Sequence, residues 1–132
     1  MLDPPGFIGG FDRRRVAFLL HSCGNVLSLM EDFIDVVGID AKHSFEDKIL
    51  PVEERYARYA SHIAIIGGLG MDLSGRGSEE EVRARTRRIL QACASGGGYC
   101  MGTGNSVAKF IKLDNYYAMI DETRRWNEEH GF

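Results

Sequence analysis

The chain has 132 residues, a mass of 14.7 kDa and 44% apolar residues, which is enough for one globular domain with a buried core. A net charge of −3 and a pI near 5.8 argue against nucleic acid or an anionic membrane as a partner. No apolar run approaches the roughly 20 residues of a membrane-spanning helix, and three cysteines without a disulfide-framework spacing predict a cytoplasmic protein with free or metal-bound thiols.

Residues 1–12 are rich in glycine and proline, and we expect them to form an irregular lead-in. Four short apolar segments follow along the chain, and each of them precedes a helical pattern. The first and third are almost continuously apolar, which is typical of parallel strands that are covered on both faces. The predicted strands are residues 16–20, 39–43, 62–68 and 98–102.

The first two helices are predicted from their apolar spacing and their start signals. Apolar residues recur at helical spacing over residues 26–37, and Asn25 stands where an N-cap would. The second helix covers residues 52–60, because Pro51 suits a helix start.

The later helices have equally clear signals. Ser78 and Glu81 form a capping box ahead of a helix over residues 82–94, and the last helix begins near Asp114. Residues 71–77, just ahead of this capping box, read as an irregular loop. Two pairs of residues are spaced to form ion pairs on the exposed side of the third helix, Glu79 with Arg83 and Glu81 with Arg85.

Four repeated β-α units predict an α/β fold with parallel strands. Two architectures fit: an open doubly wound sheet, or half of a (β/α)8 barrel. No G-x-G-x-x-G sequence opens the first helix, which weakens the dinucleotide-binding version of the open sheet. A complete barrel needs roughly 250 residues, so this chain would supply about four of its eight units.

In both architectures the chemistry lies at the carboxyl ends of the strands. His21 and Cys23 end the first strand two positions apart, which suits metal ligands but is equally compatible with packing. His43 could act there as a ligand or a general acid, or it could simply be a polar residue at a strand end. The other polar or glycine-rich positions at these ends are Gly68, Asp72, Gly104 and Asn105, which could contact a substrate or serve only the turns.

Three stretches resemble a known family: "LLHSCGNVLSLMEDFIDVVGIDAKHSFED", "IAIIGGLGMDLSGRGSEEEVR" and "GGGYCMGTGNSVAKFIKLDNYYAMIDE". They are similar to the C-terminal half of the uroporphyrinogen decarboxylase superfamily, which includes the cobalamin-dependent methyltransferases that methylate coenzyme M. The resemblance covers about residues 14–125. It implies that residues 13–132 form the C-terminal half, strands five to eight, of a TIM (β/α)8 barrel.

The resemblance also implies roles for individual residues. Methyltransferases of this superfamily hold zinc with a histidine and a cysteine matched by His21 and Cys23, and with a cysteine from the last strand, for which Cys100 is the available thiol. The spacing to "KLDN" places Asn105 where methyltransferases carry that cysteine and decarboxylases carry histidine. With the strand-end positions above, the candidate catalytic residues are His21, His43 and Asn105, and the candidate substrate-binding residues are Gly68, Asp72 and Gly104.

Three functions stay open. The chain could be the C-terminal part of an enzyme that acts on a tetrapyrrole, corrinoid or thiol, by decarboxylation or by zinc-assisted methyl transfer. It could instead be a zinc-binding module that needs an N-terminal half, or a structural half-barrel without activity. Because four parallel strands leave two unpaired edges, we expect a homo-oligomer or a partner N-terminal half-barrel.

Overall fold

The computed structural model describes residues 16–45 and 48–132, so the predicted lead-in of residues 1–12 lies outside the described residues. At its centre is one sheet of four parallel strands in the order β1-β2-β3-β4. A doubly wound sheet reverses its strand order at a switch point, whereas barrel strands follow one another in sequence. The sheet therefore has the barrel-type arrangement. The strands, β1 to β4 in turn, are Leu19–His21, Ala41–His43, Ala64–Ile66 and Tyr99–Cys100.

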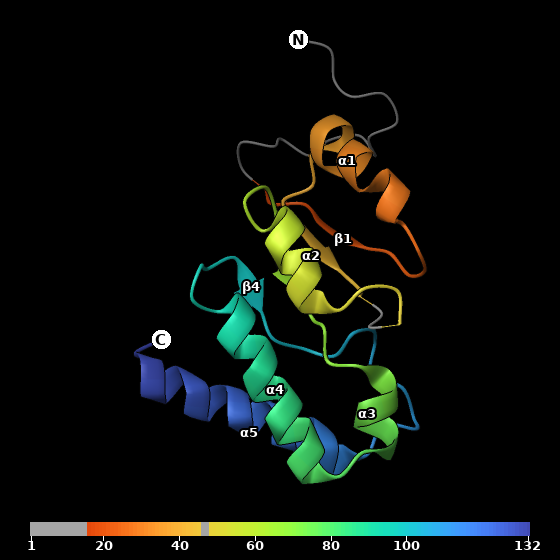
Figure 1. The fold of residues 1–132 in the computed structure, drawn as a ribbon. Coiled ribbons are helices and arrows are strands. Elements are labelled where there is room, and N and C mark those ends of the chain that lie inside the picture. The colour runs from red at the N-terminus through yellow and green to blue at the C-terminus, as the bar shows by residue number, and fades with distance from the viewer. Residues whose placement is uncertain (1–15, 46–47) are drawn as a thin grey trace.

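Helices follow the strands, and Figure 1 shows α2 between α1 and α4 and the long α5 lying against α4. None of the helices in the described residues is long and apolar enough to cross a lipid bilayer. The helical elements are η1 Leu27–Leu29, α1 Met30–Asp32, η2 Phe33–Val37, α2 Val52–Tyr59, α3 Met71–Arg76, α4 Glu79–Cys93 and α5 Leu113–His130.

The first predicted helix is present, but it changes type along its length. A 3-10 turn, a short α-helical turn and a π-helical turn follow one another from Leu27 to Val37. The N-cap is Val26, one residue after the predicted Asn25, although Asn25 Oδ1 accepts a hydrogen bond from the Leu27 N–H at 3.2 Å. Gly38 ends the element with a φ of +73°, a conformation that glycine adopts without strain.

The expectation of an irregular loop over residues 71–77 is wrong. Met71–Arg76 forms α3, and the buried Ser74 hydroxyl donates a hydrogen bond to the Gly70 carbonyl oxygen at 2.9 Å. Two glycines within seven residues suggest a loop by propensity alone. Here packing against α4 and α5 outweighs that weak preference.

The two faces of the sheet have different environments. Leu20, Lys42, Ile65 and Tyr99 lie in register and face the helices, where Ile65 is fully buried in the core. Since side chains alternate along a strand, the next residue of each strand points to the opposite face. That second row holds His21, His43, Ile66 and Cys100, none of them fully buried. It is the face that would line the interior of a complete barrel.

Charged pairs fasten the outer helices to one another. Arg83 contacts both Glu79, as predicted, and Asp121 of α5, at 2.9 and 2.6 Å. Glu81 completes the capping box with Ser78, and Arg85 forms a two-pronged ion pair with Glu53 of α2, which local spacing did not predict.

Candidate functional site

Two histidines end neighbouring strands and contact each other. The parallel register pairs His21 of β1 with His43 of β2, and their rings lie 4.9 Å apart between centroids with a tilt of 46°. Their Nδ1 atoms are 2.9 Å apart, which is hydrogen-bond distance. The pairing follows directly from the register, since both histidines occupy the last position of their strands on the same face.

Cys23 joins the pair from the loop after β1. Its Sγ lies 3.6 Å from His21 Nε2, the ring nitrogen that does not face His43. Gly24 follows at once with a φ of +81°, so the chain turns sharply after the cysteine. Cys23 is exposed, which leaves its thiol open to a molecule at this end of the sheet.

Asn105 approaches Cys23 from the loop after β4, which is 82 residues later in the chain. Its Oδ1 accepts a hydrogen bond from the Ser106 N–H at 2.8 Å, and its Nδ2 lies 3.4 Å from Cys23 Sγ, placed to donate. The Thr103 hydroxyl donates to the Asn105 carbonyl oxygen at 2.6 Å and braces the same loop. The amide nitrogen is the closer of the two amide atoms to sulfur, and the Cys23 thiol can also donate to Asn105 Oδ1 at 3.8 Å.

His21, His43, Cys23 and Asn105 form a cluster, and the Thr103 carbonyl oxygen contacts its His43 end. It lies 3.0 Å from His43 Nε2, and Thr103 itself is buried and pairs with Leu69 in a parallel bridge. Gly67 makes this approach possible. A Cβ on Gly67 would lie 2.6 Å from the Thr103 oxygen and 2.8 Å from the His43 ring, and its φ of +90° also favours glycine.

Lys42 lies beneath the cluster on the helix-facing side and is fully buried. Its ammonium group donates hydrogen bonds to the Ser22 and Ser44 carbonyl oxygens, at 3.2 and 3.0 Å, and so links the loops after β1 and β2. Burial, helped by the charge of Arg55, lowers the pKa of Lys42 to about 8, and the nearby Cys23 acts in the opposite direction.

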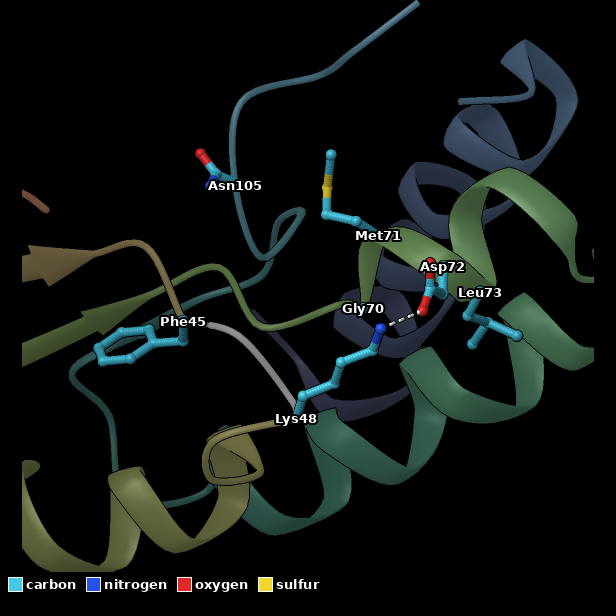
Figure 2. Close-up of a pocket in the computed structure, with 7 residues that line it drawn as sticks. All are labelled: Phe45, Lys48, Gly70, Met71, Asp72, Leu73 and Asn105. Atoms are coloured by element: carbon cyan, nitrogen blue, oxygen red, sulfur yellow. Dashed lines mark ion pairs between the residues drawn. The ribbon is translucent and has the colours of Figure 1, made fainter. Parts of the chain in front are cut away.

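A cavity of about 330 Å³ opens beside the cluster, and Asn105 belongs to both. Figure 2 shows Lys48 reaching across one side of the cavity to Asp72, where the ammonium and carboxylate groups are 3.0 Å apart. The hydrogen bond and charge of Lys48 lower the pKa of Asp72. The remaining lining is apolar or glycine: Phe45, Gly70, Met71 and Leu73.

The structure thus brings together four of the residues predicted from sequence, His21, Cys23, His43 and Asn105. Cys100 is not among them. It lies in the same row as the histidines but two strands away from His43, and its Sγ contacts the Met101 carbonyl oxygen at 3.9 Å. Within residues 16–45 and 48–132, no group of three His, Cys, Asp or Glu side chains is placed to hold a metal ion.

The predicted substrate-binding residues have different environments. Asp72 lines the cavity, and its role as a substrate contact stays a prediction. A Cβ on Gly68 would meet the Val52 side chain at 2.6 Å, and one on Gly104 would meet the Phe45 carbonyl oxygen at 2.5 Å. Both glycines therefore allow close packing within the protein, and a role in substrate binding stays a prediction for them.

Sequence reasoning missed Lys42, Thr103 and the cavity residues Phe45 and Lys48. Lys42 carried a usable signal, because a lysine inside the strand segment "IDAKH" is unusual for a buried position. Thr103 acts through its main-chain oxygen, a role that no side-chain pattern reveals.

Comparisons with known proteins agree with this architecture. The model of the uroporphyrinogen decarboxylase (URO-D) family matches residues 8–126. A methyltransferase from Methanosarcina mazei superimposes with a TM-score of 0.69 at 20% sequence identity, over 85% of this chain and 32% of that chain. The chain thus spans about a third of that protein, and at this identity the likeness shows the fold. No curated protein matches the sequence. The predicted partial (β/α)8 barrel is confirmed, and the chain belongs to the uroporphyrinogen decarboxylase family.

Proposed function

We propose that this chain is the C-terminal part of a barrel enzyme that activates a thiol for methyl transfer, with His21 and Cys23 as ligands of a zinc ion. One observation carries the proposal, the 3.6 Å between His21 Nε2 and Cys23 Sγ. Two donors on a tetrahedral zinc ion, with bonds of about 2.0 and 2.3 Å, are separated by about 3.5 Å. These two side chains fit two positions of such an ion, and further ligands would come from outside the described residues.

When bound, zinc would lower the pKa of a substrate thiol so that it becomes a nucleophile near neutral pH. The substrate thiol would lose its proton to solvent, and its sulfur would take the methyl group from a methylated donor, whose bond to that methyl group breaks with the electron pair left on the donor. A corrinoid is that donor in the branch that the chain resembles. The chain's own residues hold the parts in place: His43 orients His21, and the Asn105 amide donates toward sulfur.

The cavity beside Asn105 would bind the apolar part of the substrate. Phe45, Met71 and Leu73 supply apolar surface, and Lys48 with Asp72 supplies one charge of each sign at the same cavity. A molecule held against Asn105 has its reactive atom close to Cys23, because the same amide contacts the sulfur. The cavity therefore supports a substrate with an apolar body and a reactive end.

The test is the zinc content of the chain, measured by elemental analysis on protein that is purified without a histidine tag or chelators. We expect near-stoichiometric zinc that is lost in Cys23→Ala and retained in His62→Ala, which removes an exposed histidine outside the cluster. Cys100→Ser should also retain zinc, because Cys100 makes no contact with the cluster among the described residues. A zinc-free wild-type chain would overturn the proposal and leave decarboxylation or a structural role.

We further propose that the open face of the sheet packs against another chain, either a second copy or an N-terminal half-barrel. Leu19 on this face is 57% exposed, and β1 and β4 end the sheet within the described residues. Unpaired strand edges beside exposed apolar side chains favour association. Sedimentation equilibrium should therefore give a mass above 14.7 kDa for the purified chain. A monomer at all concentrations would contradict self-association and leave the half-barrel partner.

A further inference from the structure

We propose that His43 is a positioning residue that fixes the tautomer of His21, with the proton on Nδ1 and the lone pair of Nε2 directed at Cys23. This inference rests on the proposed function, because the tautomer matters chemically when His21 is a zinc ligand. It can be measured without zinc, substrate or turnover, so the two can fail separately.

The positions of the ring protons follow from the Thr103 carbonyl oxygen, a group that can only accept a hydrogen bond. The Thr103 carbonyl oxygen has no proton, so His43 Nε2, at 3.0 Å, must be the donor. The oxygen cannot easily move away, because Thr103 is buried and both of its chain neighbours are bonded to Leu69. The Leu69 N–H donates to the Gly102 carbonyl oxygen at 2.9 Å, and the Gly104 N–H donates to the Leu69 carbonyl oxygen at 2.7 Å. A neutral His43 therefore has a bare Nδ1.

His21 then has one consistent arrangement. Its Nδ1 lies 2.9 Å from the bare Nδ1 of His43, so it must donate, and a neutral His21 has no proton on Nε2. That bare nitrogen lies 3.6 Å from Cys23 Sγ. It can accept a proton from the thiol or coordinate a metal ion.

The opposite tautomer would disable the site. With its proton on Nε2, His21 would direct an N–H group at Cys23 and could neither coordinate a metal ion nor accept a proton there. A free neutral histidine side chain prefers this Nε2–H tautomer in water. The hydrogen bond from a second group is what commonly fixes a ligand histidine, and here a second histidine anchored on a main-chain carbonyl supplies it.

The experiment uses metal-free protein with ¹⁵N-labelled histidine, at a pH where the rings are neutral. Two-bond ¹⁵N–¹H spectra report which ring nitrogen carries the proton. We expect the Nδ1–H form for His21. His130 is an internal reference, because its Nδ1 lies 2.8 Å from the Trp126 carbonyl oxygen and must also carry a proton.

Two variants separate positioning from mere packing. His43→Phe retains a ring but cannot accept from His21, and it should switch His21 wholly or partly to the Nε2–H form. His43→Gln has an amide oxygen to accept from His21 and an amide N–H to donate to Thr103, and it should restore the Nδ1–H form.

An Nε2–H form in the wild-type chain would overturn the inference, as would an unchanged His21 spectrum in His43→Phe. If His43→Phe fails to fold, as an altered His130 spectrum would reveal, the wild-type and His43→Gln spectra still decide. A confirmed tautomer in a chain that binds no zinc would leave this inference standing and remove the proposed function.

Discussion

Replacing Asn105 with cysteine should raise the affinity of the chain for zinc by about 100-fold, the upper range of effects seen for single groups that support a metal site. Asn105 Nδ2 lies 3.4 Å from Cys23 Sγ, which is close to the spacing of two ligands on one tetrahedral ion. With His21 and Cys23 already placed, a thiolate at position 105 supplies the third protein ligand of a typical catalytic zinc site.

The measurement is competition for zinc against a chromophoric chelator near neutral pH. Asn105→Ser is the matched control, since it also removes the amide but adds only a poor zinc ligand, and it should give no increase. Combining Cys23→Ala with Asn105→Cys should abolish the gain, because one of the three ligands is lost. Equal affinities for the cysteine and serine variants would show that position 105 does not reach the metal and would contradict the proposed geometry.

The sequence was sufficient to predict the strands and the cluster at their ends. Apolar runs located all four strands, and a parallel sheet brings the residues that follow its strands to one edge. His21, Cys23 and His43 could therefore be grouped before any coordinates. Asn105 is also a strand-end position, to which the spacing in the family motif assigns a role, and the structure places its amide 3.4 Å from Cys23.

Contacts that depend on tertiary packing could not be predicted. Local spacing favours Arg85 pairing with Glu81, and it gives no sign of Glu53 on a neighbouring helix, which forms a two-pronged ion pair with the same guanidinium group. Helix α3 likewise forms in a glycine-containing stretch through its contacts with other helices. Gly68 is a third example: its place in a glycine-rich turn suggests that a ligand approaches the backbone there, but the Val52 side chain occupies the space beside it.

The buried Lys42 should have a large effect on how the stability of the chain changes with pH. The free energy of unfolding of the wild-type chain, relative to Lys42→Met, should rise by about 3 kcal/mol between pH 8 and pH 10.5. Below pH 8 the lysine is protonated in both the folded and the unfolded states, and the folded state bears the full penalty of a buried charge. Between pH 8 and pH 10.5, which are about the pKa values of Lys42 in the folded and unfolded states, the folded state releases the proton while the unfolded state retains it. Stability therefore rises with pH over this range.

Other groups act in the opposite direction over an overlapping range. Burial raises the pKa of Cys93 to about 12 and also raises that of Tyr99. Above about pH 9 the unfolded chain loses the Cys93 proton first, and stability falls with pH. The wild-type chain and Lys42→Met both contain Cys93 and Tyr99, so the difference between their free energies from urea unfolding isolates the effect of Lys42.

Lys109→Met is the matched control, because it removes the same charge from an exposed side chain, and its difference from wild type should stay flat with pH. Lys42→Met also loses the hydrogen bonds to Ser22 and Ser44, but that loss adds a constant offset of about 1–3 kcal/mol over most of the range. The slope is therefore the diagnostic quantity. A flat difference for Lys42→Met would mean that the ammonium group reaches solvent in the folded state, and that it does not link the loops that carry Cys23 and follow His43.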